Sequence, residues 1–245
     1  MNSAAQSNQT PSIFGKMFGV VAGQTVTQRK FTVLFLFQLA FLILYPYAQQ
    51  KGLPNLAVRI FGGVVTVLSV YAVSFRRGHV LFALVLAIPA LVQRIVLPRA
   101  DAGVLPVTSI ILSLAFDVFI VVVIFRRVFM KDEPTTEAIF GALCIYLLVG
   151  FGFASLYGML ATMQSHAFYL DPALNLHSVP DRFDLIYYSF ATITCLGAAG
   201  ISPVSLQARS ISVVEALIGV LYLAVLISRL LAAYHARATT LADGK

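Results

Sequence analysis

Residues 183–204 form the stretch of this 245-residue chain in which residue type and spacing could do chemistry. The apolar run 185–194 covers about 10 residues, or roughly 15 Å of helix at 1.5 Å per residue. Such a helix is about half as long as a bilayer is thick, so it cannot cross one. The chain then continues into Gly197-Ala198-Ala199-Gly200 and Pro203, which do not extend a helix comfortably. Irregular backbone at membrane depth is tolerated only inside protein or along water, so this stretch predicts a re-entrant segment that lines a wet path.

Two aspartates at the start of this stretch are suited to begin the short helix. Asp181 and Asp184 follow Pro180. An aspartate at this position can cap a helix N-terminus or interact favourably with its dipole. We therefore expect a half-length helix that starts at these residues and lies between two full-length apolar helices.

The twelve residues around the end of this helix carry a family resemblance. They read Thr192-Ile193-Thr194-Cys195-Leu196-Gly197-Ala198-Ala199-Gly200-Ile201-Ser202-Pro203. The run resembles the pore loop of the potassium-channel superfamily, where a pore helix ends in T-x-T-T-x-G-Y-G-D. Residues 208–210 and 215–226 are similar to the inner helix of two-helix-type channels, and the resemblance covers residues 137–232. It implies a homotetramer whose filter carbonyls replace the hydration shell of a cation.

The filter departs from the family pattern at four positions, and each departure has a physical consequence. Gly197 is kept, but Ala199 stands where the family has its second glycine, and left-handed φ costs a residue with a Cβ about 1–2 kcal/mol. Ala198 lacks the ring that packs against the pore helix in the family. Gly200 replaces the aspartate that forms a hydrogen bond behind the filter, and Cys195 replaces a threonine. The resemblance therefore implies a channel scaffold with a degenerate filter.

Two functional hypotheses follow from this filter. The first is a weakly selective cation pore, with no cofactor and with monovalent cations as permeant ions. The alternative is a non-conducting structural or regulatory homologue with a collapsed filter, which assembles with other channel subunits. The predicted ion pathway consists of Thr194, Cys195, Leu196, Gly197, Ala198, Ala199 and Gly200.

The composition independently indicates an integral membrane protein in contact with a lipid bilayer. Hydrophobic residues make up 59% of the chain and charged residues 11%, and the mean hydropathy is +0.89, which excludes an ordinary soluble domain. The net charge of +7 does not indicate nucleic-acid binding, because the basic residues lie at the ends of apolar runs. Cys144 and Cys195 suggest neither a disulfide framework nor a metal site. No P-loop, GxSxG or HExxH pattern is present, so we expect no enzyme.

The apolar runs predict an all-α membrane fold with six transmembrane helices and the re-entrant pore helix. The expected spans are residues 31–48, 56–75, 80–97, 104–125, 138–163 and 209–234. The predicted organisation is an N-terminal cytoplasmic or interfacial segment 1–28, a four-helix domain 29–133, a pore domain 134–236 and a short cytoplasmic tail 237–245. Residues 11–28 read equally well as an interfacial helix and as a loosely ordered tail.

The distribution of basic residues predicts the orientation. Arg29, Lys30 and the pairs Arg76-Arg77 and Arg126-Arg127 would share one side with most other basic residues. The positive-inside rule makes that side cytoplasmic, with both termini, in the plasma (cell inner) membrane. The pore loop then faces outward, as it does in the family.

The four helices before the pore domain resemble the arrangement of a voltage sensor, but the residues that sense voltage are missing. A sensor needs arginines at every third position of its fourth helix. Residues 104–120 contain no arginine and one acidic residue, Asp117. We therefore expect no voltage sensing of the usual kind.

A few further residues are candidates because of their type and depth. Buried ionisable residues in spans are functional candidates by default, which applies to Glu215 and Asp117; for Glu215 the resemblance implies a structural role behind the pore loop. Gly219 can be a gating hinge or a site of close helix packing. His166 and His177 can bind a metal or sense pH, or be solvated loop residues.

Overall fold

A computed structural model of the chain describes residues 29–50, 55–74, 77–96, 104–130, 135–175 and 177–243. Seven helices occur in these residues: α2 (Lys30–Gln50), α3 (Asn55–Ala72), α4 (Arg77–Val96), α5 (Val104–Phe129), α6 (Thr136–Met163), α7 (Arg182–Ile193) and α8 (Leu206–Asp243). The predicted interfacial segment 11–28 lies outside the described part, as do the side chains of Arg59 and Arg94, two further ionisable residues within the expected spans.

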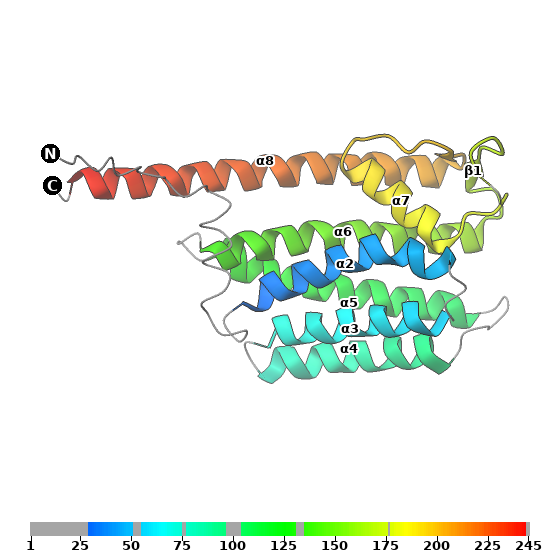
Figure 1. The fold of residues 1–245 in the computed structure, drawn as a ribbon, viewed down its shortest axis with the longest axis horizontal. Helices are drawn as coiled ribbons and strands as arrows, with labels where there is room; N and C mark the ends of the chain where they lie inside the picture. The colour runs from blue at the N-terminus through cyan, green and yellow to red at the C-terminus, as the bar shows by residue number, and fades with distance from the viewer. Residues whose placement is uncertain are drawn as a thin grey trace, which may run out of the picture.

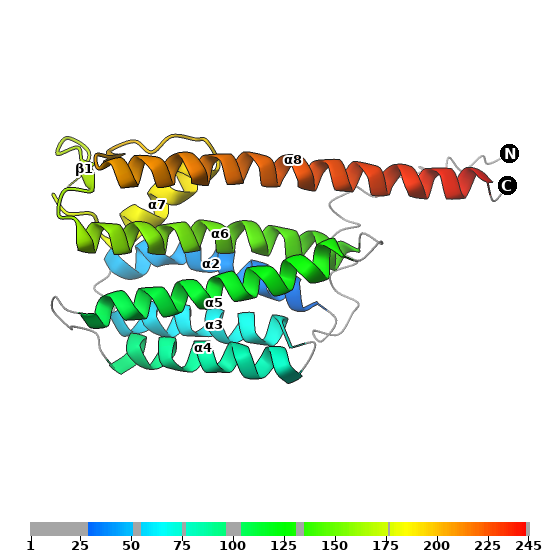
Figure 2. The same cartoon turned by 180° about the vertical axis from the view of Figure 1, so that it is seen from behind.

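The helices form a stack in which α6 joins two units. The first unit comprises α2 to α5, and the second comprises α7 and α8. Figure 1 shows α8 at one side of the molecule and α4 at the opposite side, with α6, α2, α5 and α3 between them. The helix α6 packs against both α2 and α5 of the first unit and also against α7 and α8. The view from behind shows the short α7 again between α6 and α8 (Figure 2). The helix α7 is therefore enclosed on two sides by long helices of the same chain.

A polar junction fixes α2 to the start of α6. The Glu137 carboxylate accepts hydrogen bonds from the Phe31 N–H at 3.1 Å and the Thr32 hydroxyl at 2.6 Å. One turn further along α6, a Cβ on Gly141 would lie 2.7 Å from Val128 Cγ2 and 3.1 Å from Phe31 Cδ2. These contacts attach α2 and α5 to the first turns of α6.

Length and composition identify three helices that can cross a membrane among the described residues. They are Lys30–Tyr47, Thr136–Met163 and Leu206–Ala232, and shorter apolar segments, Gly62–Ala72 and Gly78–Pro89, lie in α3 and α4. The sequence predicted six spans at the positions of α2 to α6 and α8, and three of these are supported in this way.

Two features differ from the expected fold. The last helix continues to Asp243, past the end expected near Tyr234, because the residues after Tyr234 have ordinary helix propensity and include neither Pro nor Gly before Gly244. The fold is also not purely helical: β1 (Phe168–Leu170) pairs antiparallel with β2 (Ile201–Pro203). This small sheet forms because the segment after α6 returns alongside the segment that follows the pore loop.

Candidate functional site: the pore helix and its loop

The N-terminus of α7 is fixed by a reciprocal capping box. Asp181 Oδ1 accepts a hydrogen bond from the Asp184 N–H at 2.8 Å, and Asp184 Oδ2 accepts one from the Asp181 N–H at 2.8 Å. The predicted capping role of these aspartates is confirmed. With 12 residues, α7 is about 18 Å long at 1.5 Å per residue, so it is too short to cross a bilayer.

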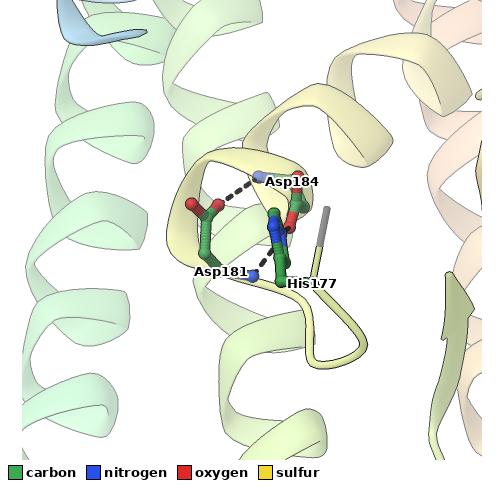
Figure 3. Close-up of side chains that lie close together, drawn as sticks. All are labelled: His177, Asp181 and Asp184. Carbon is green, nitrogen blue, oxygen red and sulfur yellow. Dashed lines mark hydrogen bonds and ion pairs between the residues drawn. The ribbon is translucent and has the colours of Figure 1, made fainter. Parts of the chain in front are cut away.

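A histidine of the outer segment, which comprises residues 164–181, binds this capping box (Figure 3). His177 Nε2 lies 2.6 Å from Asp184 Oδ2, and the histidine side chain is 46% exposed. The hydrogen bond with Asp184 raises the pKa of His177, and the charges of Asp184 and Asp181 act in the same direction. Within the described residues, these three side chains are also the group whose geometry could hold a metal ion. Because both carboxylates already accept backbone N–H groups of the helix, capping accounts for their arrangement.

The C-terminus of α7 ends in a Schellman motif that positions Cys195. The Leu196 N–H donates to the Ala191 carbonyl at 2.9 Å, and the Cys195 N–H donates to the Thr192 carbonyl at 3.0 Å. This pattern requires a left-handed residue directly after the C-cap, and Cys195 has φ of 57° after the C-cap Thr194. Its thiol is exposed, whereas the other cysteine is buried.

The handedness of the loop corrects the expectation of strain at Ala199. Among the described residues other than glycine, Cys195 alone has a positive φ. Gly197 and Gly200 have φ of 84° and 82°. The strain is therefore at the first position of the loop, and Gly200 rather than Ala199 takes the later left-handed conformation. Glycine at these two positions avoids the steric cost of a Cβ.

Hydrogen bonds from two other segments hold the outer end of the loop. The Gly200 carbonyl accepts the Asp171 N–H at 2.9 Å and the Asn175 side-chain amide at 2.8 Å. The Ala199 N–H donates to the Tyr187 hydroxyl at 3.1 Å. Sequence reasoning missed Asn175 and Tyr187, and no local pattern marks them, because each acts on a residue at least 12 positions away.

A buried polar cluster lies behind α7. Glu215 is fully buried, and its carboxylate accepts hydrogen bonds from the Tyr157 hydroxyl at 2.6 Å and from the Ser189 hydroxyl. The Tyr188 hydroxyl and Ser212 Oγ share a further hydrogen bond. The cluster thus joins α6, α7 and α8, and Glu215 lies behind the pore helix, as the resemblance implied.

Gly219 and Asp117, the two remaining candidates from the sequence, lie in different surroundings. A Cβ on Gly219 would collide with the carbonyl oxygen of Ile193, the last residue of α7. This contact supports close packing at Gly219, and a hinge there stays a prediction. Asp117 is half-buried on α5 and interacts with another residue of the chain, but α5 is not an element of the pore loop. The structure therefore brings Glu215 and Gly219 to α7 and leaves Asp117 in the first unit.

Residues 144–235 match the Ion_trans_2 family, described as an ion channel. This part of the chain is an ion channel domain. The match contains most of α6, all of α7 and its loop, and the larger part of α8, which is consistent with the predicted potassium-channel-like pore domain. No curated protein and no solved structure matches the chain.

The domain assignment fixes the general function. An ion channel domain implies cation transport through a channel and is not enzymatic. The chain is a multi-pass membrane protein, and ion channel domains typically assemble into oligomers.

Proposed function

We propose that four copies of this chain form a pore that conducts monovalent cations with weak preference among them. The ion channel domain supports a cation pore. A ring of carbonyls needs several copies around one axis, and the exposed loop offers such a lining because Leu196 is 77% exposed. The pathway would be lined by residues 194–199, and the permeant ions would be its only small ligands.

The observation that carries the proposal is the spacing of left-handed residues in the loop. In the family that the chain resembles, alternate filter residues take positive or unusual φ, which directs successive carbonyls to the ion. Positive φ occurs here at Cys195, Gly197 and Gly200. The alternate spacing is present from 195 to 197 and is lost between 197 and 200. We infer that ordered carbonyl rings extend through Gly197 and that water completes the ion shell beyond it, which weakens discrimination between potassium and sodium.

The surface of α8 supports assembly from several copies. Many apolar side chains of its membrane-spanning part are exposed in the single chain. Neighbouring copies of the chain can cover them in an assembly. They include Val213, Leu217, Val220, Leu221 and Val225. In the proposed homotetramer each chain contributes six spans, and both termini face the cytoplasm.

The hydrogen bonds at Ala199 and Gly200 favour a conducting pore over a collapsed filter. Each of these backbone groups pairs with a defined side chain of another segment, so the end of the loop has a fixed shape. A pore requires a fixed geometry at its opening. For this reason the non-conducting alternative is not adopted.

Cation uptake into liposomes tests the proposal. Purified protein should admit sodium and potassium at rates within about threefold of each other, a difference below 1 kcal/mol. The variant Ala198→Tyr with Ala199→Gly restores two positions of the family run and should raise the preference for potassium about tenfold. Ala198→Tyr alone is the matched control for the added ring. Exclusion of both ions by a folded oligomer, or strong potassium preference in the unmodified protein, would contradict the proposal.

A further inference from the structure

The first half of the outer segment contacts the end of the pore loop at several points. In the β1–β2 pair, Leu170 lies opposite Ile201. The next residue, Asp171, donates its N–H to the Gly200 carbonyl at 2.9 Å. The Asn175 Nδ2 atom lies 2.8 Å from the same oxygen and 3.0 Å from the Asp171 carbonyl. The turn 171–175 therefore forms a bracket around one peptide group of the loop.

The amide of Asn175 uses both of its N–H groups in this bracket. A side-chain amide has two donors, and here one reaches Gly200 and the other Asp171. Two directed bonds fix the orientation of the half-buried side chain. The approach is close: a Cβ on Gly200 would lie 3.0 Å from Asn175 Nδ2 and 3.2 Å from Leu174 Cβ. Position 200 therefore needs glycine for space as well as for its φ of 82°.

We propose that Asn175 is a positioning residue for the outer end of the ion pathway, in the place of the ring and the carboxylate that the loop lacks. The proposal rests on the proposed function, because it assigns Asn175 a role in that pore. Because the Gly200 carbonyl accepts hydrogen bonds from Asp171 and Asn175, its oxygen is directed away from a permeant ion. The lining of the pathway then ends at Ala199, beyond the carbonyl rings that reach Gly197, and the Ala199 N–H is held by Tyr187 from α7. Two successive residues of the loop are thus fixed from two different elements.

Hydrogen exchange on the full-length protein tests the bracket without requiring conduction. Asn175→Asp keeps the shape and replaces the donors with a carboxylate, and Asn175→Leu removes the donors without adding charge. Both should speed exchange of the amides in the bracket, at Asp171 and residues 201–202, by about fivefold, the effect of losing one ordinary hydrogen bond. Asn175→Gln, which keeps both donors, should restore part of the protection. Ser178→Ala, at an exposed residue of the same segment, should leave exchange unchanged.

Cation uptake by the same variants distinguishes the role of Asn175 from the proposed pore function. Because Asn175→Asp and Asn175→Leu loosen the outer end of the pathway, both should change the ratio of potassium to sodium uptake about threefold or more, while Ser178→Ala should not. Unchanged exchange in both variants, with α6 protected as in the unmodified protein, would overturn the role of Asn175 and leave the cation pore intact. Faster exchange in a protein that passes no cation would instead overturn the proposed function and support the bracket.

Discussion

The pore helix is held from two sides by different kinds of contact. Behind it, the buried Glu215 binds α6 and α7, and Gly219 lets α8 touch the backbone at the end of the helix. On the outer side, Asn175 and His177 bind its loop and its capping box from a surface segment. The first set of contacts lies between membrane helices, and the second lies where water can replace each bond.

The two sets of contacts should contribute differently to stability. Loss of a buried hydrogen-bond partner leaves the remaining group without water and costs its desolvation, whereas an exposed bond is exchanged for one to solvent. The buried support should therefore decide whether the domain folds. The support from residues 171–177 should decide how well the end of the loop is ordered.

The largest effect is expected at Gly219. Gly219→Val places a side chain against the Ile193 carbonyl oxygen, which belongs to backbone and cannot turn aside. We expect a loss of about 3 kcal/mol in the free energy of unfolding, measured by thermal unfolding in detergent followed by circular dichroism. Gly152→Val is the matched control because nothing lies within 4 Å of its Cβ position. Equal stability of Gly219→Val and the unmodified protein would contradict the packing described for α8.

Removal of the buried carboxylate should come next. Glu215→Leu leaves the hydroxyls of Tyr157 and Ser189 without their acceptor, and we expect a cost of about 2 kcal/mol. Glu215→Gln keeps one acceptor oxygen and should cost less. The same unfolding measurement applies. If Glu215→Leu is as stable as the unmodified protein, the cluster does not hold α7 in place.

A stabilising change is expected at the end of the pore helix. Cys195→Gly removes the Cβ from a residue with φ of 57° and should raise stability by about 1 kcal/mol. Cys195→Ala keeps the Cβ and is the control for loss of the thiol. If both variants shift the unfolding temperature equally, the Schellman geometry at Cys195 is not the cause.

The smallest effect is a pH dependence of the outer support. The pKa of His177 is raised in the folded chain above its ordinary value of 6.5 by its bond to Asp184. The stabilisation is therefore fully present below about pH 6.5 and is lost as pH rises through the raised pKa. His177→Gln should lower the unfolding temperature slightly at pH 6 and not at pH 9. A difference that is the same at both pH values would show that the ion pair contributes nothing.

The sequence was sufficient for the parts that depend on local pattern. Asp181 and Asp184 predicted the capping box, and the length of the apolar run predicted a helix too short to span a membrane. The positive φ of Cys195 was not predicted, because it follows from where the helix ends rather than from residue type. Asn175 and the β1–β2 pair could not be predicted either, since their partners lie more than 20 positions away and meet only through the fold.

The most direct test of the account asks whether cations pass Cys195. A charged, membrane-impermeant thiol reagent added outside liposomes should modify the exposed Cys195, leave the buried Cys144 intact, and stop most cation uptake. Cys195→Ala should remain active and insensitive to the reagent. We predict that block follows the extent of modification at Cys195. Complete modification of Cys195 with undiminished uptake would contradict the central claim that this loop lines the ion pathway.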